Sequence, residues 1–177
     1  MAKKIVFAGG PATGKTSMIN ALESRGYSCM HEISRQITLE ARNKGVEQLF
    51  LTDPLLFSKK LLKGRIAQHN AADKSTEPMV FLDRGLPEVL AYMDKEGTPY
   101  ATEFSKACEQ YRYDHVFIFP PWEAIYTQDN ERYEDFKEAL RIYPYLKAAY
   151  EKHGYEIIIL PKESIENRIS LVLETIA

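Results

Sequence analysis

Residues 9–16, Gly-Gly-Pro-Ala-Thr-Gly-Lys-Thr, match the pattern G-x-x-x-x-G-K-(S/T) in full. Glycine has no Cβ, so backbone N–H groups at these positions can curl around phosphate oxygens. The lysine supplies a catalytic point charge for the β- and γ-phosphates, and the hydroxyl that follows it can ligate Mg²⁺. The pattern predicts a nucleoside triphosphate site at Gly10, Pro11, Ala12, Thr13, Gly14, Lys15, Thr16 and Ser17. The alternative is a glycine-rich turn with an incidental lysine.

A second pair of charged residues, Asp83 and Arg84, follows the apolar run Met79–Leu82. A carboxylate at the end of a strand beside the phosphate loop can reach Mg²⁺ or accept a proton from a hydroxyl group. We therefore predict that Asp83 is a metal-binding and catalytic residue. Arg84 is predicted to hold an acceptor phosphate or the transferring group. The alternative for Asp83 is a helix N-cap.

Glu32 and Arg35 are three residues apart at the start of an expected helix, so they share one face. They fit two interpretations equally: a carboxylate and a guanidinium that recognise an acceptor, or an N-terminal acid and a solvated arginine. Arg132 lies in a polar stretch, residues 122–135, that a P-loop kinase would use as a lid. A lid arginine neutralises charge during phosphoryl transfer, and the alternative for Arg132 is a surface ion pair.

These residues must be positioned by alternating strands and helices. Short apolar runs predict strands at 5–8, 27–30, 79–82, 115–119 and 156–160. Helices are expected at 15–25, 33–43, 54–75, 86–95, 102–111, 136–153 and 164–176. The alternation predicts an α/β three-layer sandwich with a parallel sheet, in which ligands bind beyond the carboxyl ends of the strands. Three strands (5–8, 80–82 and 157–160) are continuously apolar, which is typical of strands covered on both faces.

Length and composition exclude several classes of protein. A chain of 177 residues with 45% hydrophobic residues is expected to form one domain, 1–177, with the lid at about 122–135. The net charge of −2 does not indicate a surface for nucleic acid or anionic membrane. No apolar run approaches the roughly 18 residues of a membrane span. Cys29 and Cys108 are expected to be reduced thiols, and the protein is expected to be cytoplasmic.

The phosphate loop, the blocks at 32–35 and 81–87, and the segment from 113 to 161 resemble small bacterial predicted ATPases of the AAA-type domain group, related to the ribosylnicotinamide kinase domain. The resemblance implies a P-loop kinase fold with a five-stranded parallel sheet in the order 2-3-1-4-5. It also implies that Lys15 and Thr16 meet phosphate and Mg²⁺, that Asp83 takes the magnesium or base position, and that Arg132 is the lid arginine.

Two functions remain open from the sequence. The first is a Mg·ATP-dependent phosphotransferase that acts on a small nucleoside-like or other hydroxyl acceptor, with the turn at 161–164 near the adenine. The second is a slow ATPase or GTPase switch that acts through a protein partner. ATP is favoured by default, because the guanine-selective (N/T)-K-x-D motif has no match. A ring-forming motor ATPase is disfavoured because the chain is short for its extra elements.

Overall fold

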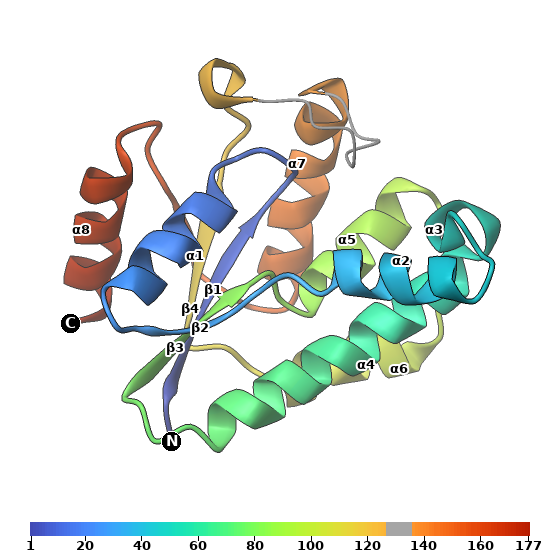
Figure 1. The fold of residues 1–177 in the computed structure, drawn as a ribbon, viewed down its shortest axis with the longest axis horizontal. Helices are drawn as coiled ribbons and strands as arrows, with labels where there is room; N and C mark the ends of the chain where they lie inside the picture. The colour runs from blue at the N-terminus through green and yellow to red at the C-terminus, as the bar shows by residue number, and fades with distance from the viewer. Residues whose placement is uncertain (127–135) are drawn as a thin grey trace.

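The computed structural model describes residues 1–126 and 136–177. These residues form a five-stranded sheet in the order β2-β3-β1-β4-β5, and every neighbouring pair is parallel (Figure 1). The strands are β1 (Lys3–Gly9), β2 (Ser28–Met30), β3 (Met79–Asp83), β4 (His115–Phe119) and β5 (Ile157–Ile159). The predicted fold class and the strand order implied by the resemblance are both confirmed.

Helices connect the strands close to the positions that the sequence predicts. They are α1 (Lys15–Ser24), α2 (Ser34–Asn43), α3 (Leu49–Thr52), α4 (Pro54–Asp73), α5 (Pro87–Lys95), α6 (Thr102–Gln110), α7 (Phe136–Lys152) and α8 (Ile165–Ile176), together with the short 3₁₀ helix η1 (Glu123–Ile125). The sequence pattern predicts neither α3 nor η1. The starts of α4 and α8 follow ordinary capping rules, because Asp53 and Ser164 accept hydrogen bonds from backbone N–H groups three residues on.

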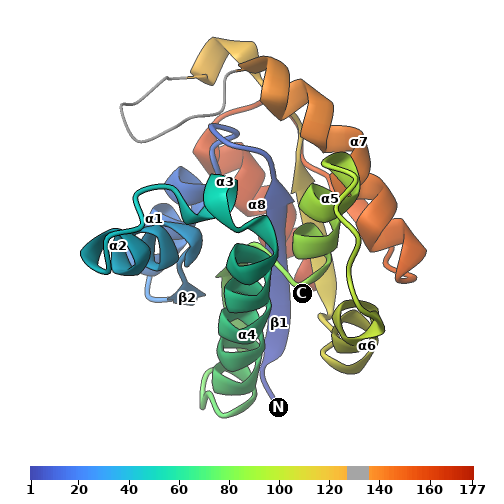
Figure 2. The same cartoon turned by 90° about the vertical axis from the view of Figure 1, so that its right-hand side faces the viewer.

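Side-chain alternation along the strands divides the core into two layers. Ile5 and Phe7 of β1 pack in a cluster with residues of α1 and α8, whereas Val6 and Ala8 pack in a cluster with residues of α4, α5 and α7. Figures 1 and 2 show α1 and α8 on one side of the sheet and α4, α5 and α7 on the other. The result is the predicted three-layer sandwich, with β1 buried at its centre.

The strand register brings the carboxyl ends of the strands together. Phe7 of β1 pairs with Asp83 of β3, and Gly9 pairs with Phe119 of β4. Because all strands run in one direction, the segments that follow β1, β3 and β4 meet at the same edge of the sheet. This edge carries the phosphate loop and Asp83, as expected for ligand sites in open parallel sheets.

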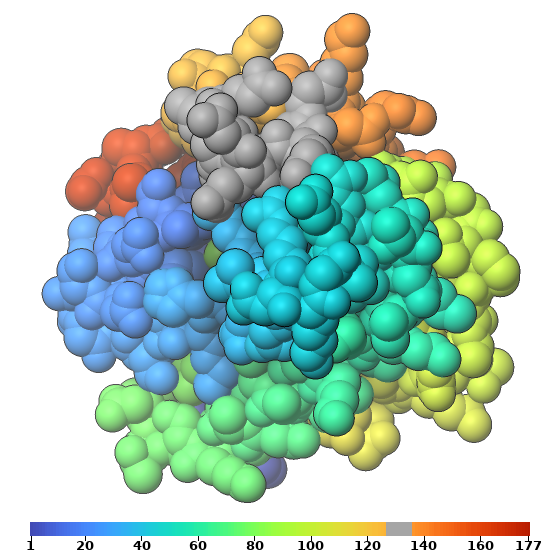
Figure 3. All heavy atoms as spheres, turned by 45° about the vertical axis from the view of Figure 1, so that its right-hand side comes forward, coloured from blue at the N-terminus to red at the C-terminus, as the bar shows by residue number. Residues whose placement is uncertain are grey.

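The edge of the sheet is more exposed to solvent than the sequence predicts. The edge strand β5 was expected to be covered on both faces, which is wrong for Ile159, whose exposure is 49%. An edge strand has a neighbour on one side only, and Ile159 lies on the same face as Ile157, the face of α7, so α8 on the opposite face cannot cover it. Helices α2 and α3 form part of the molecular surface, shown in cyan and teal in Figure 3. No helix among the described residues is long and apolar enough to cross a membrane.

Candidate active site

The phosphate loop lies between the end of β1 and the start of α1. Gly14 precedes α1 with φ +92°, a left-handed conformation that favours glycine. Ala12 is also left-handed, with φ +54°. No side chain caps the N-terminus of α1, so the first N–H groups of this helix remain directed to a ligand. A helix N-terminus with free N–H groups is a favourable place for phosphate oxygens.

Lys15 is buried inside the loop. Its Nζ donates hydrogen bonds to the Gly10 carbonyl oxygen at 2.6 Å and to Thr13 Oγ1 at 3.3 Å. Burial lowers the pKa of Lys15 to about 8, and the Arg84 charge adds to this effect, although nearby carboxylates oppose it. The ammonium group therefore occupies the phosphate cradle and is held by weak neutral acceptors that phosphate oxygens can replace.

Asp83 ends β3 directly beside β1. Its side chain is buried, and Oδ1 has no hydrogen-bond partner within the described part of the chain. Burial raises the pKa of Asp83, although Lys15 and Arg84 act against this shift. Helix α5 starts at Pro87, and no side chain caps it. The alternative interpretation of Asp83 as an N-cap is therefore wrong.

Thr16 and Ser17 are exposed in the first turn of α1. The donor set of Thr16 and the unpartnered Asp83 oxygen fits Mg²⁺, which prefers oxygen ligands and binds proteins through few of them. Within residues 1–126 and 136–177 no group of three or more His, Cys, Asp or Glu side chains forms a metal cage. Mg²⁺ usually needs no such cage, because water and substrate phosphates supply its remaining ligands.

Arg84 follows Asp83 and turns back toward the sheet. Its φ of +76° is left-handed, which is rare for a residue with a side chain. Its N–H donates to the Phe7 carbonyl oxygen at 3.0 Å, and this bond holds the strained turn. Gly85 comes next, where a Cβ would lie 2.6 Å from the Tyr150 hydroxyl oxygen. The turn therefore depends on glycine at position 85, because α7 approaches it closely.

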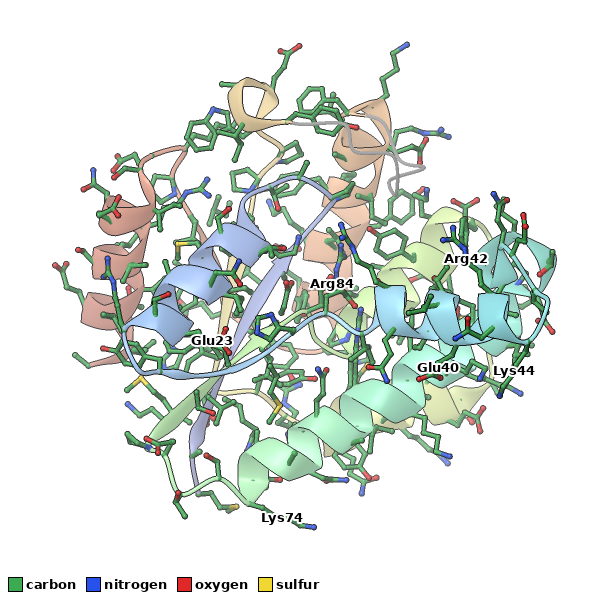
Figure 4. All side chains as sticks on the ribbon, viewed as in Figure 1. Glu23, Glu40, Arg42, Lys44, Lys74 and Arg84 are labelled. Carbon is green, nitrogen blue, oxygen red and sulfur yellow. The ribbon has the colours of Figure 1, made fainter. Side chains whose placement is uncertain are left out.

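The Arg84 guanidinium lies between two carboxylates. Its Nε pairs with Glu32, and its Nη1 pairs with Glu88 Oε2 at 2.9 Å. The same guanidinium lies over the Tyr92 ring, 5.8 Å from the ring centre. Figure 4 shows Arg84 near the centre of the molecule, close to the beginning of α2, whereas Glu40, Arg42 and Lys44 lie toward the far end of that helix.

Arg65, from α4, contacts both the turn after β3 and Glu32. Its Nη1 donates to the Gly85 carbonyl oxygen at 2.6 Å, and its Nη2 lies 3.6 Å from Glu32 Oε1. Together these side chains form what we term the charge cluster: Glu32, Arg65, Asp83, Arg84 and Glu88. Its members come from α4, α5, the end of β3 and the segments that follow β2 and β3, and all lie at the carboxyl edge of the sheet.

The carboxylates of the charge cluster differ in their electrostatics. Burial would raise the pKa of Glu32, but Arg84 and Arg65 outweigh it and the pKa is lowered. Glu32 Oε1 also accepts hydrogen bonds from the two backbone N–H groups at the start of α2, at 2.9 and 3.0 Å. Glu88 is fully buried, and burial raises its pKa despite the neighbouring arginines. Glu32 is thus a fixed negative charge, whereas Asp83 and Glu88 bind protons more readily.

On the other side of the phosphate loop lies a pocket of about 320 Å³, termed here the donor pocket. Its walls come from the phosphate loop, from the segment after β4 and from the start of α8. It is lined by Ala12, Thr13, Gly14, Lys15, Thr16, Ser17, Trp122, Ile125, Glu163, Ser164, Ile165 and Arg168. The turn expected near the adenine, 161–164, contributes Glu163 and Ser164 to this lining.

The structure brings Lys15, Glu32, Asp83 and Arg84 together but leaves Arg35 exposed on α2. Arg132 lies outside the described residues. At the charge cluster and the donor pocket, the buried residues Arg65, Glu88 and Arg168 were assigned no role from the sequence. The spacing of Glu88, four residues after Arg84, was a usable signal. Arg65 and Arg168 gave none, because each resembles an ordinary polar residue of an amphipathic helix.

The sequence matches the AAA domain family over residues 4–168. The chain belongs to this family. The resemblance noted from the sequence motifs is confirmed by this match, which includes the phosphate loop, the charge cluster and the donor pocket. No curated protein is significantly similar to this AAA-domain protein in sequence.

Solved structures share the fold at low sequence identity. A deoxyadenosine kinase from M. mycoides with dCMP and dCDP is 15% identical, has a TM-score of 0.69 and aligns over 98% of both chains. The NadR protein in complex with NR is 18% identical with a TM-score of 0.71, over 99% of this chain and 50% of NadR. Thymidylate kinase from Ehrlichia chaffeensis is 14% identical with a TM-score of 0.59, over 99% of both chains. At such identities the likeness establishes a common fold.

Proposed function

We propose that this AAA-domain protein is a Mg·ATP-dependent phosphotransferase that acts on a small nucleoside-like or other hydroxyl acceptor. The observation that carries the proposal is the charge cluster beside Lys15. A triphosphate-binding switch needs the phosphate loop and one carboxylate near Mg²⁺, but it has no need of the further largely buried pairs formed by Glu32, Arg65, Arg84 and Glu88. Keeping such groups buried is costly unless they are paired or used, and an acceptor site is one such use.

The solved structures with this fold support the same reaction class. Two of the three described above are kinases by name, one for deoxyadenosine and one for thymidylate. Fold alone does not determine function, since one fold hosts many activities. The argument for transfer to an acceptor therefore depends chiefly on the residues at the carboxyl edge of the sheet.

The residues divide into donor and acceptor roles. Lys15 and the N–H groups at the start of α1 would bind the β- and γ-phosphates. Thr16 and Asp83 would hold Mg²⁺, and the bound ion would neutralise part of the phosphate charge. The carboxylate oxygen of Asp83 that does not meet Mg²⁺ would accept the proton of the acceptor hydroxyl. Arg84 would bind the acceptor or the transferring group.

Glu32 takes a different role in this proposal. Its carboxylate is engaged by Arg84, by Arg65 and by backbone N–H groups, so it holds the Arg84 guanidinium in place. Arg35 would contribute only at the exposed rim of the acceptor site. A lid at 122–135 and a catalytic role for Arg132 stay predictions from the sequence. They are tested by the turnover of an Arg132→Ala variant at saturating ATP.

The test is an acceptor screen. Nucleosides and small alcohols are incubated with the protein and Mg·ATP, and ADP release is measured together with the mass of any phosphorylated product. We expect one acceptor class to raise ADP release well above the background and to gain the mass of one phosphoryl group. ADP release that no acceptor changes would overturn the transferase proposal and favour a regulatory switch.

A further inference from the structure

Arg168 connects the two walls of the donor pocket. It lies in the first turn of α8 and is 2% exposed. Its Nε donates to the Pro161 carbonyl oxygen at 2.7 Å, and its Nη1 donates to the Thr13 carbonyl oxygen at 3.2 Å. One side chain thus joins the turn after β5 to the phosphate loop, across 155 residues of sequence.

Aromatic rings hold the Arg168 guanidinium in place. Its Cζ lies 5.0 Å from the centre of the Trp122 ring and 5.3 Å from that of Phe119. These separations suit cation–π contacts. The phosphate loop also lies close to the guanidinium, since a Cβ at Gly14 would lie 3.0 Å from Arg168 Nη1. The guanidinium therefore has little freedom, and its direction is set before any ligand binds.

One nitrogen of this fixed group is unused. Arg168 Nη2 is buried and has no hydrogen-bond partner among the residues that the structure describes, although the side chain lines the donor pocket. Buried donors are nearly always paired, so this nitrogen needs an acceptor that the described residues do not supply. The mechanism proposed above does not use this nitrogen.

The position of Arg168 indicates which part of a triphosphate it meets. Lys15 lies on the β3 side of the loop, where its charge interacts with Asp83 and Arg84. Arg168 lies on the opposite side, against β4 and the turn after β5. Both cations line the donor pocket and both bond to Thr13 of the loop. A triphosphate held at Lys15 leaves the wall formed by Arg168 and the turn after β5 for the nucleoside part of the ligand.

We propose that Arg168 is a specificity-determining residue of the donor site, and that its Nη2 donates a hydrogen bond to the base of the bound nucleotide. The inference rests on the proposed function of the phosphate loop as the triphosphate site. A guanidinium carries donors only. The base atom that it meets is therefore a ring nitrogen or a carbonyl oxygen, and never an exocyclic amino group.

The first experiment compares ligands with and without a base. Isothermal titration calorimetry with Mg·ATP and with Mg·tripolyphosphate is performed on the wild type and on Arg168→Lys, which keeps the charge but loses the fork of donors. We expect Arg168→Lys to weaken ATP binding about tenfold, the scale of one hydrogen bond to a charged group. Tripolyphosphate binding should weaken clearly less, through the lost Nη1 bond to the Thr13 carbonyl oxygen alone. Arg25→Lys, at an exposed arginine after α1, is the matched control.

Each other outcome of this comparison contradicts the proposal. Equal losses for ATP and tripolyphosphate would mean that Arg168 acts on the phosphate loop alone. Unchanged ATP affinity would exclude a contact with the base. The wild type is also titrated with 2′,3′-dideoxy-ATP, which lacks the sugar hydroxyls. If its affinity is as low as that of Arg168→Lys for ATP, the hydrogen bond is made to the sugar and not to the base. A wild type that binds neither ATP nor tripolyphosphate would instead refute the triphosphate site itself.

A second measurement requires no variant and so does not depend on the folding of Arg168→Lys. The wild type is titrated with 1-deaza-, 3-deaza- and 7-deaza-ATP, each of which lacks one ring nitrogen acceptor. The fluorescence of Trp122, the single tryptophan of the chain, reports binding beside Arg168. We expect one analogue to bind about tenfold more weakly than ATP. Equal affinity of all three analogues and ATP would overturn the proposal.

Discussion

The phosphate loop and the charge cluster lie side by side at the carboxyl edge of the sheet but are built in different ways. The loop is one continuous segment whose ligand groups are backbone N–H groups, one lysine and one hydroxyl. The charge cluster consists of side chains from residues 32 to 88, on α4, α5, the end of β3 and the segments that follow β2 and β3. In the proposed function the loop would bind phosphate, a group common to all nucleotides, whereas the charge cluster would face the acceptor, which differs between enzymes.

This contrast indicates which residues can be changed with a local effect. A change at Lys15 should alter triphosphate binding and little else, because its hydrogen bonds stay within the loop. A change in the charge cluster should also affect neighbouring helices and strands, because each charge there has partners on other elements. Substitutions in the two regions can therefore separate them, and a strong effect is expected first of all at Asp83.

Asp83→Asn should lower turnover by roughly 100-fold or more, the scale of a lost general base. ATP affinity should stay within about tenfold, because the phosphate loop is unchanged. Turnover, ATP affinity and the melting temperature are measured on the same variant, with Glu32→Gln for comparison. A larger loss of turnover in Glu32→Gln would move the proton-accepting role to that residue.

Lys15→Ala should weaken ATP binding by about 100-fold, because hydrogen bonds to charged groups contribute about 1.5–3 kcal/mol. The fold should persist, since Lys15 donates hydrogen bonds only within the loop itself. Calorimetry gives the affinity and circular dichroism the fold, with the exposed Lys63→Ala as the matched control. An unchanged ATP affinity would show that the phosphate loop is wrongly assigned.

Glu88→Gln should lower the free energy of unfolding by about 3 kcal/mol, because Arg84 then loses a buried charged partner. It should also raise the KM of the acceptor more than that of ATP, since Arg84 lies in the charge cluster and outside the donor pocket. Denaturant unfolding and steady-state kinetics test both effects, with the exposed Glu77→Gln as control. Equal changes in the KM of the acceptor and the KM of ATP would show that the charge cluster and the donor pocket do not act separately.

Raising the pH should weaken ATP binding through Lys15. With a pKa of about 8 in the free protein, Lys15 is mostly charged at pH 7 and mostly neutral at pH 9. Phosphate requires the charged form, so ATP affinity should fall by about tenfold between these values. The same shift has the opposite sign for stability, because the cost of burying the charge disappears as pH rises above 8. In Lys15→Ala both dependences should vanish.

Arg35→Ala should change the acceptor KM by less than about threefold, less than the substitutions at the other proposed site residues. Exposed charges contribute about 0–1 kcal/mol in interactions with other charges, and Arg35 is exposed on α2. Steady-state kinetics with the acceptor from the screen provide the measurement. A loss as large as that of Glu88→Gln would restore Arg35 to the centre of the acceptor site.

Much of the fold and part of the site could be predicted from residue order alone. The glycines and the lysine of the loop act locally, so their spacing is enough to indicate phosphate binding. Continuous apolar runs indicated a parallel sheet, and that sheet placed Asp83 beside the loop. The strand β5 was the exception, because its sequence does not show that it lies at the edge of the sheet.

The phosphate site and the α/β class could be read from the order of the residues, because both follow from short-range rules on backbone conformation and side-chain alternation. The partners of Arg84 and the surroundings of Arg168 could not, since they exist only in the folded chain. Arg65 reaches Gly85 across 20 residues, and Arg168 reaches Thr13 across 155. Such contacts depend on strand order and helix packing, which place residues that are distant along the chain at the same edge of the sheet.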